Sequence, residues 1–286
     1  MLTETFHSIA TAARNVFRSW QSMLLIAAVY ASLLALLYLF VSIKEATMAQ
    51  VVLTFAFAVI APLLFFILQA MIADGGARQP LKESTGETQQ FSVVLLLKRS
   101  LTSFWKLILI TLPLIALAIL IAYLLGRAQH RFGLPANEPG LTAPHPMAST
   151  PNAPPAHPIN WRLALFSTLR YLSFGLFLPL AAIHLWLATV HDGLGGALRR
   201  IASLLSRAFA PQSVLIYIAG FLIFAVAPYF LLFKTTPSSH AWLELFFLVV
   251  RLVVVFALTL FGWTITVRAL ELFAKNARTQ PATEAT

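Results

Sequence analysis

The chain lacks cysteine altogether and carries few charged residues. Lys, Arg, Asp and Glu make up 10% of its 286 residues, whereas soluble domains carry about 25%. Without cysteine there is no disulfide framework and no thiolate chemistry. Just two of the ten acidic residues are aspartates, so the chain cannot form a site that needs several aspartate carboxylates. The sequence also contains no P-loop, HExxH, GxSxG or paired-carboxylate motif.

What the chain has in abundance is apolar residues. They account for 59% of the sequence, and the mean hydropathy is +0.82. This composition indicates an all-α integral membrane protein, a polytopic helical bundle. The net charge of +10 and the pI near 10.4 are then explained by orientation in the membrane and not by nucleic-acid binding. Basic residues flank membrane spans and attract anionic lipid head groups. We therefore expect membrane lipids, and no nucleic acid, as partners.

Six apolar runs are long enough to cross a hydrocarbon core, which takes about 20 helical residues. They cover residues 21–43, 48–73, 107–125, 161–190, 212–233 and 241–267. Three basic amphipathic segments precede alternate spans and are expected to lie along the membrane surface as interfacial helices. For the first segment, an extension of the first span into the cytoplasm is the alternative. These segments cover residues 3–20, 91–106 and 195–211.

The basic residues are distributed unevenly between the two sides of the predicted spans. Thirteen Lys and Arg residues lie on the side of the termini and five lie on the other side. Under the positive-inside rule, this excess predicts a multi-pass protein of a bacterial inner (plasma) membrane with both termini in the cytoplasm.

Three similar hairpin units succeed one another in the predicted order of elements. The proposed repeats cover residues 1–76, 77–196 and 197–275, followed by a flexible tail at 276–286. Asp-Gly pairs close the first two units at residues 74 and 192, and the second unit contains an external loop, 127–160, that holds eight of the sixteen prolines. Such a composition cannot bury enough apolar surface to become ordered, so we expect this loop to be disordered. Weak internal repeats are common in transport folds.

Two arginines lie inside predicted spans, Arg170 in the fourth and Arg251 in the sixth. An arginine at such depth is costly and usually faces a partner or a wet cavity. Glu244 precedes Arg251 by seven residues and shares its helix face, but one carboxylate cannot neutralise two guanidiniums. The unmatched arginine is therefore a candidate ligand for an anion such as a lipid phosphate. The alternative is that both arginines extend toward the head groups.

His184, in the fourth span, is the remaining polar candidate. A buried histidine there is more often a hydrogen-bonded packing residue than a proton relay. His130, His145 and His157 fall in the proline-rich loop at spacings that match no metal-ligand pattern, so no metal or other cofactor is expected.

One short stretch resembles a known family signature. The sequence Asp-Gly-Gly-Ala-Arg at residues 74–78 is similar to the opening of the CDP-alcohol phosphotransferase motif, in which later aspartates hold metal ions. Here the spacing is one residue short and the chain has two aspartates in total. The metal site of that family cannot be built, and the resemblance is rejected.

These patterns leave three hypotheses for function. The leading one is a non-enzymatic membrane protein that is permease-like or binds an anionic lipid or small anion through Arg170, Arg251, Glu244 and His184. The first alternative is a structural or assembly protein whose basic interfacial helices dock a cytoplasmic partner. The second is a membrane-embedded lipid-active enzyme, for which the spans contain few polar groups.

Overall fold

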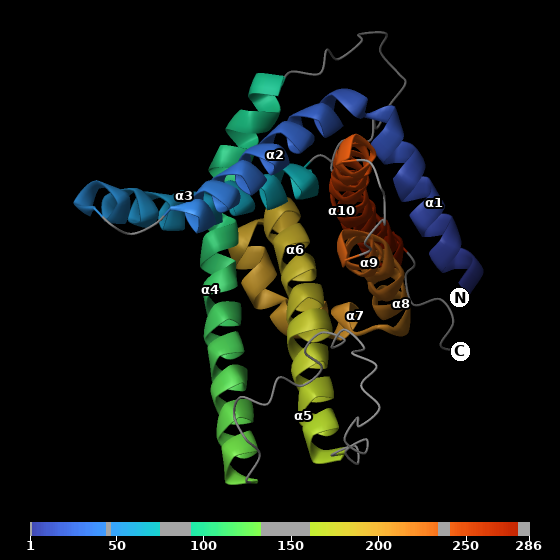
Figure 1. Ribbon diagram of the computed structural model, residues 1–286. Coiled ribbons are helices and arrows are strands. Elements are labelled where there is room, and N and C mark those ends of the chain that lie inside the picture. Colours follow the sequence, from blue (N-terminus) through green and yellow to red (C-terminus); the bar gives the residue numbers. More distant parts are fainter. Residues whose placement is uncertain (1, 44–46, 75–92, 133–160, 234–240, 280–286) are drawn as a thin grey trace, which may run out of the picture. The chain divides into compact units, whose positions relative to one another are not determined.

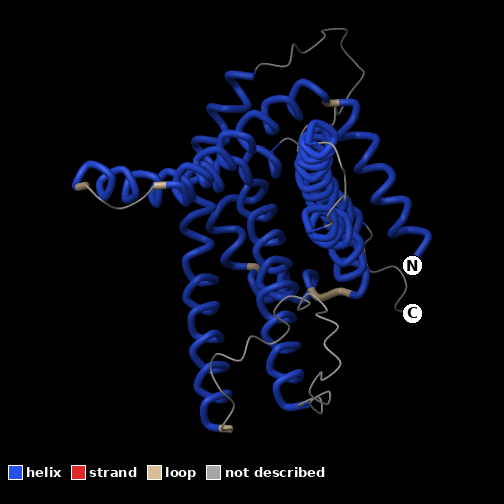
Figure 2. Tube along the Cα trace, in the orientation of Figure 1, coloured by secondary structure: helices blue, strands red, loops and turns tan. Residues whose placement is uncertain are grey.

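The computed structural model describes residues 2–43, 47–74, 93–132, 161–233 and 241–279. All regular secondary structure in these ranges is helical (Figure 2). The predicted all-helical class is therefore confirmed. The exit at residues 75–78, most of the proline-rich loop and the end of the tail lie outside the described residues.

The described chain folds into ten α-helices and two π-helical segments (Figure 1). In chain order these elements are α1 (Leu2–Arg18), α2 (Trp20–Ser42), α3 (Met48–Asp74), α4 (Val93–Arg131), α5 (Trp161–Leu172), η1 (Ser173–Phe177), α6 (Leu178–Arg199), α7 (Ile201–Ala208), α8 (Pro211–Phe221), η2 (Leu222–Val226), α9 (Ala227–Phe233) and α10 (Ala241–Thr279).

Within the described residues, six helical stretches are long and apolar enough to cross a membrane, as the sequence predicts. They are Trp20–Ser42, Met48–Asp74, Leu97–Arg131, Trp161–Arg199, Pro211–Phe233 and Trp242–Lys275. The length and the apolar composition of these helices thus indicate a multi-pass membrane protein. Many of the large apolar side chains on these stretches are exposed, which is the pattern that lipid, rather than water, tolerates.

Two helices are longer than the sequence suggests. α4 continues without a break from Val93 to Arg131, so the expected interfacial helix at 91–106 is not separate from the third span, and the loop expected from residue 127 begins later. α10 continues to Thr279, beyond the expected end of the sixth span at residue 267. No proline or glycine interrupts the chain at residues 106–107 or 267–268, and Gly126, at the expected end of the third span, is tolerated inside α4, so nothing stops the backbone hydrogen-bond ladder.

The chain divides into two compact units. One comprises residues 1–110 and 180–286, and the other comprises residues 111–179. In the smaller unit, a ring contact between Phe132 and Phe166, with centroids 5.9 Å apart, links the end of α4 to α5. This division does not follow the three consecutive repeats, which stay a prediction.

In the larger unit, α10 is the helix with the most neighbours. It contacts α1, α3, α8, η2 and α9, and α2 contacts α3. Figure 1 shows α1 alongside α10. α1 buries Ala12 and Val16 and exposes Arg14, as expected for an amphipathic helix.

Prolines in the spans have two different effects on the helices. Pro62 and Pro113 lie inside uninterrupted α-helix. Pro179 and Pro228 each follow a π-helical segment that begins six residues earlier, at Ser173 and Leu222. Proline lacks an N–H and its ring crowds the carbonyl four residues before it. Widening the preceding turn by one residue relieves that crowding, and π-bulges of this kind bend helices.

Glycines determine two local features of the larger unit. Gly193 has φ 75° and kinks α6 just after Asp192, so the chain turns there, as the sequence predicts. Gly220 in α8 faces Thr266 in α10 so closely that a Cβ at residue 220 would lie 1.9 Å from Thr266 Oγ1. Close crossings at small residues are the usual way in which membrane helices pack.

We predict that Gly220→Ala destabilises the protein by about 1–3 kcal/mol, the usual cost of overpacking. Thr266 cannot simply turn away, because its Oγ1 donates a hydrogen bond to the Gly262 carbonyl oxygen at 2.6 Å. The measurement is the melting temperature of the detergent-solubilised protein. Gly126→Ala is the matched control, because a Cβ there meets no atom within 4 Å and alanine favours helix. Equal melting temperatures for the two variants would show that α8 and α10 do not cross at Gly220.

Candidate functional site

A group of ionisable side chains gathers around a buried carboxylate where α3, α6 and α10 meet, and its members range from buried Asp74 and Glu271 to exposed Lys275. We call Asp74, His191, Arg268, Glu271 and Lys275 the charged cluster. Its centre is the Glu271 carboxylate, of which 3% is exposed. Glu271 Oε1 lies 2.7 Å from Lys275 Nζ and 3.2 Å from His191 Nε2. Glu271 Oε2 accepts a hydrogen bond from Arg268 Nη1 at 3.3 Å.

Helix periodicity brings the members of the charged cluster together. Arg268, Glu271 and Lys275 are spaced three and four residues apart, so they lie on one face of α10. His184 and His191 are seven residues apart on α6, which again places them on one face. Asp74 is the last residue of α3.

The charges of the cluster compensate one another. The Arg268 side chain is 11% exposed and feels both Glu271 and the buried Asp74 electrostatically. Burying an ion without a partner costs several kcal/mol, and ionisable groups inside membrane proteins are rare and usually functional. The 3.2 Å approach of His191 Nε2 to Glu271 Oε1 brings α6 into contact with α10.

A cavity of about 100 Å³ opens beside the charged cluster. Its polar walls carry two cationic side chains, Arg207 from α7 and Lys275, against one carboxylate, Glu271. The complete lining is His184, Leu187, Ala188, His191, Leu204, Arg207, Glu271, Ala274 and Lys275. With both histidines neutral, the walls therefore keep one formal positive charge. Among the described residues, no three His, Asp or Glu side chains are grouped in a way that could hold a metal ion.

His184 has an unusual position in this cavity. Its side chain is buried, with 3% exposed, and its Nδ1 lies 3.0 Å from the Leu180 carbonyl oxygen. Its Nε2 has no hydrogen-bond partner in the described part of the chain. A buried polar atom without a partner is expensive, so this atom is suited to meet a ligand or an ordered water.

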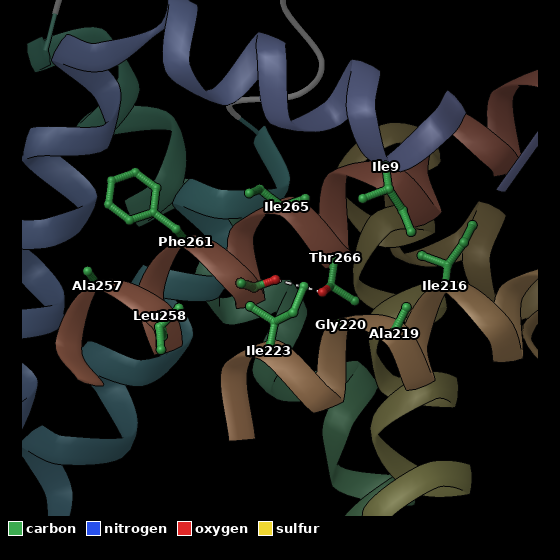
Figure 3. A pocket seen from close by; sticks show the side chains of 11 residues that line it. Ile9, Ile216, Ala219, Gly220, Ile223, Ala257, Leu258, Phe261, Ile265 and Thr266 are labelled. Atoms are coloured by element: carbon green, nitrogen blue, oxygen red, sulfur yellow. Dashed lines mark hydrogen bonds between the residues drawn. The ribbon is translucent and has the colours of Figure 1, made fainter. Parts of the chain in front are cut away.

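A second, larger cavity of about 250 Å³ lies between α1, α8, η2 and α10 (Figure 3). Figure 3 shows that its walls are apolar apart from Thr266, whose hydroxyl is engaged with a backbone carbonyl. The lining is Ile9, Ile216, Ala219, Gly220, Ile223, Ala257, Leu258, Phe261, Gly262, Ile265 and Thr266. Within its lining, no free polar side chain is available to orient a polar ligand.

The candidate residues from the sequence fall in different places. His184 lines the charged cavity, whereas Arg170, Arg251 and Glu244 line neither cavity. Arg170 in α5 and Glu244 in α10 are exposed, and Arg251 in α10 is half-buried. Anion binding at Arg170 and Arg251 stays a prediction.

Sequence reasoning missed the charged cluster. Arg268 and Lys275 lie beyond the predicted end of the sixth span at residue 267, and the sequence patterns give Glu271 no role. One signal was available, because the spacing of Arg268, Glu271 and Lys275 predicts ion pairs on a helix. Convergence with Asp74 and His191 depends on tertiary packing and has no signature in the sequence.

Comparison of the chain with protein-family models, with curated proteins and with solved structures finds no match.

We predict that Glu271→Gln lowers stability by roughly 3–5 kcal/mol, which is typical when one partner of a buried ion pair is removed. Arg268 would keep Asp74 nearby, so the lower end of this range is expected. Thermal unfolding in detergent measures the effect. Glu244→Gln, which changes an exposed carboxylate on the same helix, is the control and should leave the melting temperature unchanged. A Glu271 variant as stable as this control would show that the carboxylate does not hold α6 and α10 together.

Proposed function

We propose that this protein is a non-enzymatic multi-pass membrane protein that binds a small oxyanion, free or as the head group of a lipid, in the cavity beside the charged cluster. The observation that carries the proposal is the composition of the cavity walls. Arg207 and Lys275 face one carboxylate, and that carboxylate already contacts cations. Guanidinium and ammonium groups bind oxyanions through charge-assisted hydrogen bonds.

The volume of the cavity supports a small ligand. Most sites for drug-sized molecules measure about 300–1,000 Å³, whereas this cavity measures about 100 Å³. A tetrahedral oxyanion group with five heavy atoms, free or at the end of a larger molecule, suits that space.

The position of the cluster also supports the proposal. Asp74 ends the second candidate span, His191 lies late in the fourth, and Glu271 lies late in the sixth. Because successive spans alternate in direction, these ends belong on the same side as the N-terminus. The positive-inside rule makes that side the cytoplasm, so we propose an inner (plasma) membrane protein whose anion site opens toward the cytoplasm.

Arg170 and Arg251 remain a rival location for the anion. They lie inside apolar runs, where a cation is costly unless it meets a partner. The two locations differ in their supporting chemistry. The cavity combines cations with polar neighbours from three helices. The proposal for the two arginines rests only on how far each lies from the ends of its apolar run.

The test is stabilisation of the detergent-solubilised protein by inorganic phosphate, since a ligand that binds the folded state raises its melting temperature. We expect Arg207→Gln to weaken phosphate binding by roughly tenfold to a hundredfold, because one charge-assisted hydrogen bond is lost. Arg199→Gln, which changes an exposed arginine of α6, is the control and should bind as the wild type does.

The same titration on Arg170→Gln and Arg251→Gln distinguishes the two locations. If these variants lose phosphate binding and Arg207→Gln keeps it, the cavity is the wrong site. If the wild-type protein shows no stabilisation at millimolar phosphate, the proposed function is wrong.

A further inference from the structure

The hydrogen-bonding state of His184 narrows the class of anion, and this inference rests on the proposed function. The Leu180 carbonyl oxygen, 3.0 Å from Nδ1, can only accept a hydrogen bond. Nδ1 must therefore carry a hydrogen and donate it. In a neutral imidazole the other nitrogen then has no hydrogen. Nε2 of His184 consequently presents a bare lone pair, and it has no partner in the described chain.

The cationic side chains of the cavity are hydrogen-bond donors, unlike Nε2 of His184. Arg207 and Lys275 can donate hydrogen bonds and cannot accept them. Ligand atoms near these two side chains must therefore be acceptors, whereas the ligand atom that meets His184 must be a donor. A fully deprotonated oxyanion has acceptors alone and would leave Nε2 unsatisfied.

We propose that the cavity selects an oxyanion that retains an acidic O–H, namely inorganic phosphate or a phosphate monoester. The P–OH group donates to Nε2 of His184, while the other oxygens accept from Arg207 and Lys275. Sulfate near neutral pH and phosphodiesters have no such O–H and are disfavoured. The recognition involves no bond making or breaking.

An ordered water could satisfy Nε2 in the unliganded cavity, and this strengthens the selectivity. A ligand that displaces such a water without replacing its hydrogen bond loses affinity. Hydrogen phosphate replaces the bond and sulfate does not. If the imidazole itself took up a proton, Nε2 would donate to either anion and the preference would disappear.

The primary test compares phosphate with sulfate on the wild-type protein. At about pH 8, phosphate is mainly the hydrogen phosphate dianion, which matches sulfate in charge and tetrahedral shape. We expect phosphate to bind roughly tenfold to a hundredfold more tightly, the range that corresponds to leaving a buried acceptor unsatisfied. Dissociation constants come from thermal-shift titration at constant ionic strength.

Equal affinities for phosphate and sulfate would overturn this inference and leave the proposed anion site intact. Binding of neither anion would overturn both. The two failures are therefore distinguishable in one experiment that needs no variant.

Two variants examine the role of His184 itself. His184→Asn keeps an N–H close to the position of Nδ1, where it can donate to the Leu180 carbonyl, and removes the acceptor at Nε2. We expect it to lose the preference for phosphate over sulfate. His184→Gln carries an amide oxygen that reaches the position of Nε2 and should restore part of the preference. A preference that persists in the Asn variant would overturn the assignment of His184 as the acceptor.

Lipids mixed into the micelles identify the source of the phosphate group. Displacement of inorganic phosphate by phosphatidic acid, a monoester, and not by phosphatidylglycerol, a diester, would support the inference and make a lipid the source. Displacement by neither lipid would support it with free phosphate as the ligand. Displacement by phosphatidylglycerol would show that no O–H is required and would overturn the inference.

Discussion

The contact of the buried Glu271 carboxylate with cations from its own helix and with His191 of α6 is the constraint on which the larger unit depends. In a membrane the hydrophobic effect does not hold helices together, because lipid tails are as apolar as leucine. Close packing and polar contacts between helices must do so instead. Glu271 supplies such a contact between α6 and α10, and a second joins α3 to α10, where Trp263 Nε1 donates to Gln69 Oε1 at 3.0 Å.

α10 serves two environments along its length. Its first half exposes Trp242, Phe246 and Val253, which suits a surface solvated by acyl chains. Its second half buries Thr264, Thr266 and Glu271. The two threonines donate to carbonyl oxygens one turn earlier on the same helix, so they need no partner elsewhere, whereas Glu271 needs cations. The charged cluster therefore forms at the end of α10 where other helices cover it.

The sequence was most informative where a property depends on residues close together in the chain. Length and hydropathy predicted the six apolar crossings, and the Asp192-Gly193 pair predicted the turn in α6. The same local reasoning placed a boundary at residue 107 that α4 does not have, because Lys98 and Arg99 look like an interfacial segment although nothing breaks the helix. Nor does the presence of a proline in a span reveal its effect, because Pro179 and Pro228 follow π-helical segments whereas Pro62 and Pro113 lie in uninterrupted α-helix.

The candidate site was less accessible to sequence reasoning, for a physical reason. Depth along a span can be counted from residue numbers, and this count singled out Arg170 and Arg251. Burial depends on which face of a helix meets a neighbour. Arg268 and Glu271 lie at the end of an apolar run and resemble a solvated helix terminus, yet contacts with α3 and α6 bury them. For His184 the sequence left a packing residue and a ligand-binding residue open, and in the structure Nδ1 meets the Leu180 carbonyl oxygen while Nε2 has no hydrogen-bond partner in the described chain.

The choice of histidine at residue 184 fits an anion site better than a carboxylate would. A carboxylate would accept a hydrogen bond from a P–OH group more strongly, but it would also place a second negative charge beside Glu271 and opposite the incoming anion. Charge repulsion increases steeply as the effective dielectric falls, and part of the cavity wall is apolar, formed by Leu187, Ala188 and Leu204. A neutral imidazole supplies an acceptor without that repulsion, and its other nitrogen is held by the helix backbone. The cavity can therefore distinguish ligands by their hydrogen-bond donors while its net charge still favours an anion.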